Sequence, residues 1–207
     1  MPRVATPPDV REAILDATMR LMERYGYKKM TMEDIAQEAQ IGKATIYGHF
    51  NNKEDVAISV IDRHQRRFLE QWQELAVTDT PPDARLRLML LTHVLYGFDK
   101  AQCYRQSMDE TLASLRHLVL PKREQYVGKL ALILMVVVQE GCDKGLFVCD
   151  DALIAARTLM TCIGAFGPTN LSPRELGERD EIAARTNQVV DLVLHGLFLR
   201  TKEHSET

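Results

Sequence analysis

Apolar residues recur along most of this chain at intervals of three and four positions, which is the spacing of amphipathic α-helices. The strict apolar–polar alternation of a half-buried strand is not found, and no internal repeat stands out. We therefore predict an all-α fold of about nine helices, in which a three-helix N-terminal unit precedes a larger helical domain.

The first helix is predicted to begin at Asp9 and to end at Gly26, with apolar residues at helical spacing between them. Asp9 and Glu12 have the spacing of a capping box. We expect residues 1–8 to form a mobile arm.

Two short helices follow, joined by a tight turn at Ile41 and Gly42. Thr31 has the cap spacing with Asp34 for the first of them, and the second is predicted over 43–49. Helices of this length are unstable alone, so they need their neighbours as a platform. We expect three apolar side chains to hold them in the core: Ile35, Ile46 and Phe50.

Helical patterns continue to the end of the chain. Residues 78–84 have the composition of a linker, and 167–178 that of a loop. The later helices that we predict are one over 53–72 capped by Asn52, one from about 83 to beyond 98, one over 104–118, one from 121 to about 144 ended by Gly145, one capped by Asp150 or Asp151 and running through 166, and one from 180 to about 202.

Charge is distributed unevenly along the chain. The net charge is -3, so no overall positive field attracts nucleic acid. Residues 1–70 hold 11 basic and 11 acidic residues, yet 39–53 has no Asp or Glu although the chain has 29. A phosphate backbone lying against this stretch explains why negative charge is excluded from it.

The segment TMEDIAQEAQIGKATIYGHFNNKEDV resembles the DNA-binding domain of the TetR-like (tetracycline-repressor-like) transcriptional regulators. Two short helices around a turn are followed by the pattern K-x-T-[LI]-Y-x-[HY]-F-x-x-K-[ED]-x-[LV], and the match covers roughly residues 10–56. The resemblance implies a helix-turn-helix over 9–54 and an effector-binding and dimerisation domain over 55–207. It also implies a homodimeric repressor of a palindromic operator in double-stranded DNA.

The short helix over 43–49 is expected to face the major groove. Its lysine can reach a phosphate or a guanine edge, and its tyrosine can reach a phosphate or a thymine methyl group. The resemblance implies phosphate contacts for Tyr47 and Lys53. The predicted DNA-binding residues are Thr31, Lys43, Ala44, Thr45, Tyr47, Gly48, His49 and Lys53.

Two glycines depart from the family pattern. Gly42 stands where a serine or threonine cap is usual, and Gly48 where a larger base-reading side chain is common. Glycine inside a helix costs about 1 kcal/mol relative to alanine. Either the backbone at Gly48 approaches DNA closely, or fewer bases are read.

The C-terminal helices are expected to serve dimerisation, and the middle helices to hold a small, largely apolar effector. The predicted dimer residues are Ala155, Ala156, Leu159, Val189, Val193 and Leu197. The predicted effector residues are Trp72, Met89, His93, Tyr96, Met108, Tyr126, Met135, Met160 and Phe166.

Several alternatives stay open. A helical protein-interaction module could keep this unit without binding DNA. His93 and His117 with a cysteine could hold a metal, and the cysteines at 103, 142, 149 and 162 could sense oxidants. No catalytic motif indicates an enzyme, and no cofactor is expected.

The chain shows no signal for export. Its N-terminus lacks the apolar segment of a signal peptide, and its most apolar run, 130–138, is far shorter than the roughly 20 residues of a membrane span. We expect a cytoplasmic protein with reduced thiols and no membrane partner.

Overall fold

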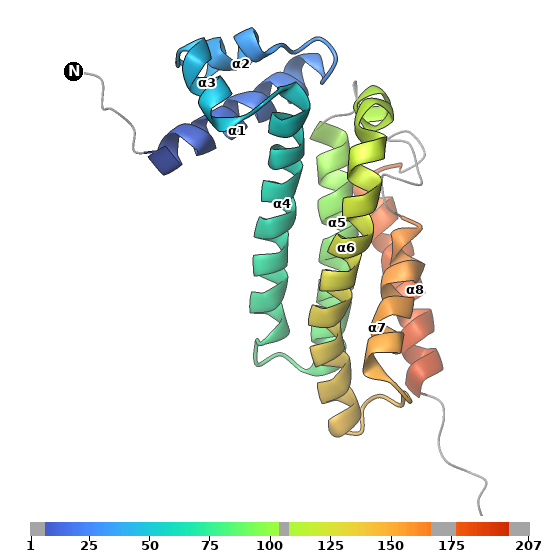
Figure 1. Cartoon of the computed structure of the whole chain (residues 1–207). Helices are drawn as coiled ribbons and strands as arrows, with labels where there is room; N and C mark the ends of the chain where they lie inside the picture. The colour runs from blue at the N-terminus through green and yellow to red at the C-terminus, as the bar shows by residue number, and fades with distance from the viewer. Residues whose placement is uncertain (1–6, 104–107, 167–176, 199–207) are drawn as a thin grey trace, which may run out of the picture. The chain divides into compact units, whose positions relative to one another are not determined.

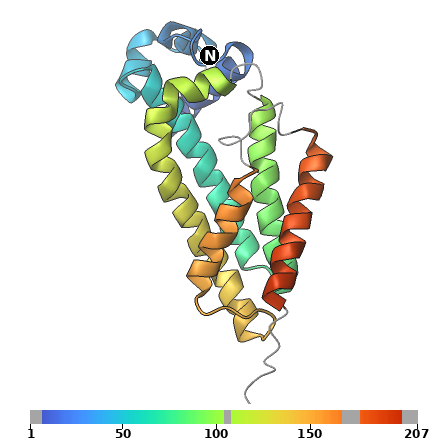
Figure 2. The ribbon, with the colours of Figure 1, turned by 90° about the vertical axis from the view of Figure 1, so that its right-hand side faces the viewer.

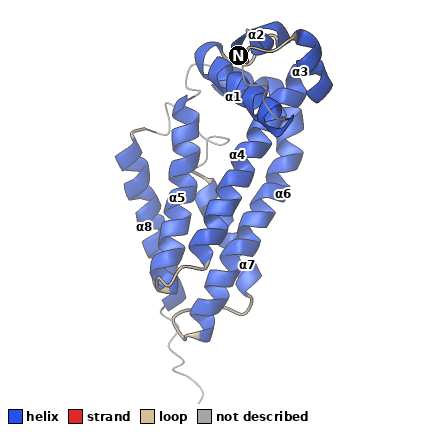
Figure 3. Cartoon of the chain, turned by 90° about the vertical axis from the view of Figure 1, so that its left-hand side faces the viewer, coloured by secondary structure: helices blue, strands red, loops and turns tan. Residues whose placement is uncertain are grey.

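The computed structural model describes residues 7–103, 108–166 and 177–198, and within these ranges it contains only helices, turns and loops (Figures 1 and 3). The all-α prediction is confirmed. The side chains of residues 7–9, 103, 108–113 and 195–198 lie outside the description. The described helices are α1 (Pro7–Tyr25), α2 (Met32–Glu38), α3 (Lys43–His49), α4 (Lys53–Ala76), α5 (Pro82–Cys103), α6 (Met108–Asp143), α7 (Ala152–Gly164) and α8 (Arg179–Phe198).

The described residues divide into two compact units. Unit 1 has the residues up to Arg67 together with Cys103–Arg123, and unit 2 has Phe68–Gln102 together with the residues from Glu124 onward. Both α4 and α6 therefore contribute residues to each unit. The predicted functional boundary between residues 54 and 55 stays a prediction.

Unit 1 is built around one apolar core. Ile14 and Leu15 of α1, Ile35 of α2 and Ile46 of α3 have no exposed surface, and Phe50 is 2% exposed. The prediction that Ile35, Ile46 and Phe50 are core residues is confirmed. Leu115 of α6 is buried in the same cluster.

Helices α2 and α4 begin at residues whose side chains accept hydrogen bonds from first-turn N–H groups, which have no carbonyl partner within the helix. The Thr31 hydroxyl accepts a hydrogen bond from the Asp34 N–H, and the Asp34 carboxylate accepts one from the Thr31 N–H, which is the predicted capping box. Asn52 caps α4 through a hydrogen bond from the Asp55 N–H, as predicted. By contrast, α1 begins at Pro7 rather than Asp9, because proline tolerates a first-turn position where no N–H bond is needed.

The N-terminal part of α6 differs from the prediction. Two helices were expected over 104–118 and 121–144, but one helix runs from Met108 to Asp143 with Pro121 inside it. Proline removes one backbone hydrogen bond and disfavours a helix interior. Before the proline, Leu115 is buried and Leu118 packs against the core of unit 1, and after it Leu130 and Ala131 are buried. Burial therefore holds the helix on both sides of the proline.

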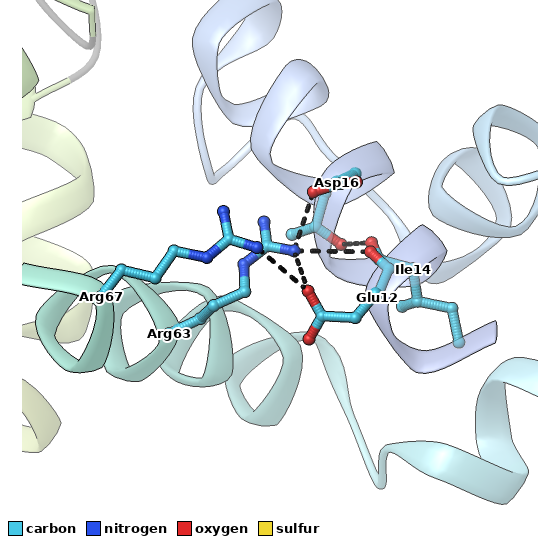
Figure 4. Close-up of polar contacts among 6 residues, drawn as sticks. Glu12, Ile14, Asp16, Arg63 and Arg67 are labelled. Atoms are coloured by element: carbon cyan, nitrogen blue, oxygen red, sulfur yellow. Dashed lines mark hydrogen bonds and ion pairs between the residues drawn. The ribbon is translucent and has the colours of Figure 1, made fainter. Parts of the chain in front are cut away.

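A buried arginine joins α4 to α1 within unit 1. Arg63 is 4% exposed, and its Nη1 lies 2.7 Å from the Asp16 carboxylate and 3.0 Å from that of Glu12. Figure 4 shows Arg63 and Arg67 reaching from α4 toward the two acids on α1. The pairing neutralises a charge that would be costly to bury alone.

Unit 2 contains antiparallel helices tied by ion pairs. Arg87 pairs with Asp191, and the Arg179 Nε lies 2.9 Å from the Asp99 carboxylate, so α5 and α8 run side by side in opposite directions (Figure 2). Arg85, buried on α5, donates to Glu140 of α6 at 2.6 Å.

The segment Ser114–Asp143 of α6 is long and apolar enough to cross a membrane by length and composition alone. Core helices of globular proteins meet the same two criteria, so this property does not by itself indicate a membrane protein.

Candidate nucleic-acid interface

Helix α3 presents nearly all of its side chains to solvent. Only Ile46 is buried, five of its seven residues are exposed, and His49 is half-buried. Tyr47 keeps 46% of its surface exposed. A buried isoleucine therefore anchors a helix whose remaining surface is free to meet a ligand, and this surface has no acidic residue.

The turn before α3 is a helix C-cap motif. Gln40 has a φ of 56°, its N–H donates to the Gln37 carbonyl, and the Ile41 N–H donates to the Ala36 carbonyl. These two bonds and the partly buried Ile41 fit a Schellman motif, in which glycine usually takes the left-handed position. The predicted tight turn at Ile41 and Gly42 thus starts one residue earlier, at Gln40.

The two glycines have different surroundings. Gly42 caps α3 without any side-chain hydrogen bond, so the predicted loss of the cap is confirmed. A Cβ atom at Gly42 would lie 3.7 Å from the Thr45 hydroxyl, which is ordinary contact, and one at Gly48 would meet nothing within 4 Å. Neither glycine is required by packing within the described structure.

Lys43 is paired across the turn. Its ammonium contacts the carboxylate of Glu33 on α2, and this hydrogen bond raises the pKa of Lys43 and lowers that of Glu33. Both side chains are more than half exposed. A pair of this kind contributes little to stability and exchanges readily for another anion.

Lys53 lies against the loop between α1 and α2. Its Nζ donates to the Tyr27 carbonyl at 3.2 Å and to the Lys28 carbonyl at 3.4 Å, and it sits 4.4 Å from the centre of the Tyr27 ring. Burial raises the pKa of Tyr27. Lys53 is half-buried, and its ammonium already donates to two carbonyls of the loop. The predicted phosphate contact would be made by this same ammonium.

Thr31 is exposed, but its hydroxyl is used inside the capping box. It donates to the Asp34 carboxylate at 2.8 Å while accepting from the Asp34 N–H. A phosphate contact by this hydroxyl would have to replace the bond to the carboxylate. Ala44 and Thr45 are exposed on α3, as their predicted role needs.

The motif did not single out Arg11, on α1. Its guanidinium carbon lies 5.0 Å from the centre of the Phe50 ring, directly after α3, and its Nη2 donates to Ser59. The side chain is exposed. Nothing local marks Arg11, because its proximity to Phe50 depends on how α1 packs on α3.

Met108 belongs to unit 1, and the other predicted effector residues lie in several places within unit 2. Trp72, His93 and Tyr96 gather around Phe68, with ring centres 4.4 to 5.8 Å apart. The Trp72 Nε1 is buried with no hydrogen-bond partner among the described residues. Burial raises the pKa of Tyr126, and the electrostatic interaction with Tyr96 raises it further.

The other predicted effector residues are not part of this aromatic cluster. Met89 and Met160 are buried in the core. Met135 lines a separate cavity of about 440 Å³. Phe166 is half-buried, and the side chain of Met108 lies outside the described residues.

Two of the predicted dimer residues are turned inward. Ala156 has no exposed surface and Leu159 has 4%, so the chain's own core covers both. Ala155, Val189 and Val193 are half-buried, and the side chain of Leu197 lies outside the described residues. The exposed large apolar side chains on these two helices are Ile154, at 64%, and Leu192, at 74%.

Comparison with known proteins agrees with this geometry. A family model described as "Bacterial regulatory proteins, tetR family" matches residues 14–60, which include α2 and α3. The crystal structure of a TetR transcription regulator from Haloarcula marismortui aligns with a TM-score of 0.72 and 25% identity, over 92% of this chain and 98% of that one. Residues 14–60 therefore carry the DNA-binding domain of the TetR family of transcriptional regulators. TetR-family proteins are regulators rather than enzymes.

Two further matches have printed names that refer to fatty acid regulation or to an acyl-CoA. The "Fatty acid metabolism regulator protein" of Bacillus subtilis is 24% identical over 188 residues, which are 89% of this chain and 93% of the relative. The structure of FadR from Bacillus subtilis in complex with stearoyl-CoA has a TM-score of 0.65 and 22% identity, over 89% of this chain and 98% of that one. At this identity the structural match shows the shared fold alone.

Proposed function

We propose that this protein is a homodimeric transcriptional repressor that binds a palindromic operator through α3 and is released by a small, largely apolar effector. The observation that carries the proposal is the exposed, acid-free surface of α3, held in place by the buried Ile46. In this proposal residues 9–54 read DNA, and residues 55–207 bind the effector and the second subunit.

The charge of α3 suits a modest set of phosphate contacts. Lys43 is its single lysine, His49 and Tyr47 can donate to phosphate, and Arg11 adds a guanidinium beside Phe50. Each cationic contact releases counterions from DNA, so affinity is expected to fall steeply as salt rises.

A dimer interface is proposed on the exposed faces of α7 and α8. Ile154 and Thr158 lie four residues apart on α7, and Arg185, Gln188 and Leu192 follow helical spacing on α8; all five are exposed. Two copies of this face would cover Ile154 and Leu192, which are otherwise open to water.

The interface can be tested with one charge at its centre. Leu192→Asp is expected to convert the dimer to a monomer in sedimentation velocity. Leu132→Asp is the control, since Leu132 is a half-exposed apolar residue on α6 outside the proposed face. A Leu192→Asp variant that remains dimeric would show that the interface lies outside this face of α7 and α8.

A long-chain acyl-CoA is the effector class to test first. One Bacillus subtilis relative is named a fatty acid metabolism regulator, and a structure of FadR from Bacillus subtilis is titled as a stearoyl-CoA complex. In this chain, Phe68, Tyr96 and buried methionines supply apolar surface, and the Trp72 N–H supplies an unpaired donor for a carbonyl oxygen. Stearoyl-CoA is expected to release operator DNA, whereas coenzyme A alone is not.

DNA recognition is tested by selecting binding sites from a random double-stranded pool. The native protein is expected to enrich a palindrome, and Tyr47→Ala to enrich none. Tyr25→Ala is the matched control, because Tyr25 is similarly exposed, at 51%, but lies at the end of α1. Failure of the native protein to enrich any site at low salt would favour a protein-interaction module instead.

A further inference from the structure

The connection between α6 and α7 brings two cysteines together. Cys142 lies in the last turn of α6 and Cys149 precedes the α7 cap residue Asp151 by two positions. Their sulfur atoms are 2.9 Å apart, and both thiols are free and half-exposed. A disulfide bond is about 2.05 Å long, so the sulfurs need to approach by less than about 1 Å.

The loop holds the two cysteines in place through its backbone. Leu146 and Phe147 both donate their N–H groups to the Gly141 carbonyl, at 2.8 and 3.1 Å. Gly145 has a φ of 70°, which permits the sharp reversal. The Phe147 ring lies so close to Gly141 that any Cβ there would overlap it. The pairing is therefore part of a specific loop structure.

The thiol pair also opens onto a cavity of about 440 Å³. Cys142 and Cys149 line it together with Met135, Gln139 and the segment 150–153. A small oxidant can therefore reach the sulfurs without unfolding of the loop. No three His, Cys, Asp or Glu side chains among the described residues gather as a metal site, which leaves thiol chemistry as the property to consider.

We propose that Cys142 and Cys149 form a reversible intrachain disulfide when the protein meets hydrogen peroxide. The Cys142 thiolate attacks one peroxide oxygen, the O–O bond breaks, and Cys142 becomes a sulfenic acid as hydroxide leaves. The Cys149 thiolate then attacks that sulfur, the S–O bond breaks, and a second hydroxide leaves. The two thiol protons convert both hydroxides to water, so two cysteines lose two electrons and one peroxide gains them.

The order of attack follows from the surroundings of Cys149. Burial raises the pKa of Cys149 to about 11, and Cys142, Asp150 and Asp151 add to this effect. Cys149 therefore holds its proton near neutral pH and is the slower nucleophile. The finished bond would tie the last turn of α6 to the start of α7, and a thiol reductant would reverse it.

The test uses the full chain, reduced and then exposed to hydrogen peroxide. Trypsin cleaves after Lys129, Lys144 and Arg157, so the two cysteines fall on different peptides, 130–144 and 145–157. The expected result is one linked peptide pair that dithiothreitol separates. The pair should persist in Cys103→Ser and in Cys162→Ser, the controls for the remaining cysteines. Separate sulfinic acids, or links between chains only, would overturn the proposal.

The order of attack has its own readout. In Cys149→Ser, a sulfenic acid at Cys142 is expected to accumulate and to be trapped by dimedone. In Cys142→Ser, Cys149 is expected to remain a thiol at the same peroxide dose. Trapping at Cys149 but not at Cys142 would reverse the assigned roles. These assays contain no DNA or effector, so their outcome is independent of the proposed repressor function.

Discussion

The carboxylate of Glu33, in the first turn of α2, pairs with the ammonium of Lys43 at the start of α3. The pair joins the two helices of the helix-turn-helix across its turn. In the absence of DNA, the one lysine of α3 is thus directed at an acid rather than at solvent alone. A DNA phosphate would compete with Glu33 for the same ammonium.

Removing the carboxylate is therefore expected to strengthen DNA binding. Glu33→Gln frees Lys43 and removes a negative charge near the phosphates, which should raise affinity about 2- to 5-fold at low salt and much less at high salt. Fluorescence anisotropy with a selected operator measures this. Glu23→Gln, on exposed α1 surface, should change affinity little. Weaker binding by Glu33→Gln would mean that the pair positions Lys43 for DNA.

Gly48→Ala separates the two interpretations of the glycine in α3. Since a Cβ at Gly48 meets nothing within 4 Å, alanine should raise the free energy of unfolding by about 0.5–1 kcal/mol. If the backbone approaches DNA closely here, the same change should cost at least about 10-fold in affinity. Gly128→Ala, on α6, has equal space and should stabilise without affecting DNA binding. Unchanged affinity for DNA in Gly48→Ala would indicate that α3 reads fewer bases.

Gln40→Gly tests the strain in the turn. Gln40 occupies a left-handed conformation that costs a side-chain-bearing residue about 1 kcal/mol relative to glycine. Urea unfolding should therefore show a rise of about 1 kcal/mol. Gln37→Gly, inside α2, should show a loss of similar size. A loss in both variants would mean that the Gln40 side chain contributes more than its backbone strain costs.

Arg63 and its two acids should respond unequally to substitution. Replacing both Glu12 and Asp16 by amides leaves the buried guanidinium without a counter-charge, which should lower the free energy of unfolding by about 2–4 kcal/mol. Arg63→Met removes the buried positive charge, so no counter-charge is required. Its free energy of unfolding should stay within about 1 kcal/mol of that of the native protein. Arg66→Met, at an exposed position, is the surface control. A loss in Arg63→Met as large as that in the double amide variant would show that the intact ion pairs stabilise the protein more than a buried apolar side chain does.

Disulfide closure should accelerate with pH. Because the pKa of Cys149 is raised to about 11, its thiolate fraction grows about tenfold per pH unit between pH 7 and 9. The groups that disfavour its charge are Cys142, Asp150 and Asp151. Following the dimedone-sensitive sulfenic acid at Cys142 over time measures the closure rate. A rate that stays flat over this range would contradict a protonated Cys149.

Much of the DNA-binding unit could be predicted from local sequence. The bounds of α3, the capping box of Thr31 with Asp34, and the burial of Ile46 all depend on residues a few positions apart. The prediction was wrong where the local preference of a residue and its tertiary packing favour different structures. Pro121 should end a helix by its own chemistry, yet burial of Leu115 before it and of Leu130 after it keeps α6 continuous.

The C-terminal helices show a second limit. Apolar residues follow α7 and α8 on more than one face, so sequence alone could not tell which stripe the chain covers itself. The structure buries Ala156 and Leu159 and exposes Ile154 and Leu192, which reverses the expected outward face on α7. Periodicity locates a stripe but not its partner.

By itself, the sequence determined the helical class, the helix-turn-helix and an acid-free recognition helix, because helix periodicity, caps and local charge act over a few residues. Only the tertiary structure decided which distant groups meet. Arg63 reaches Glu12 across 51 positions, and Arg87 reaches Asp191 across 104. Such contacts follow from the way whole helices bury their apolar faces, and no short window of sequence contains that information.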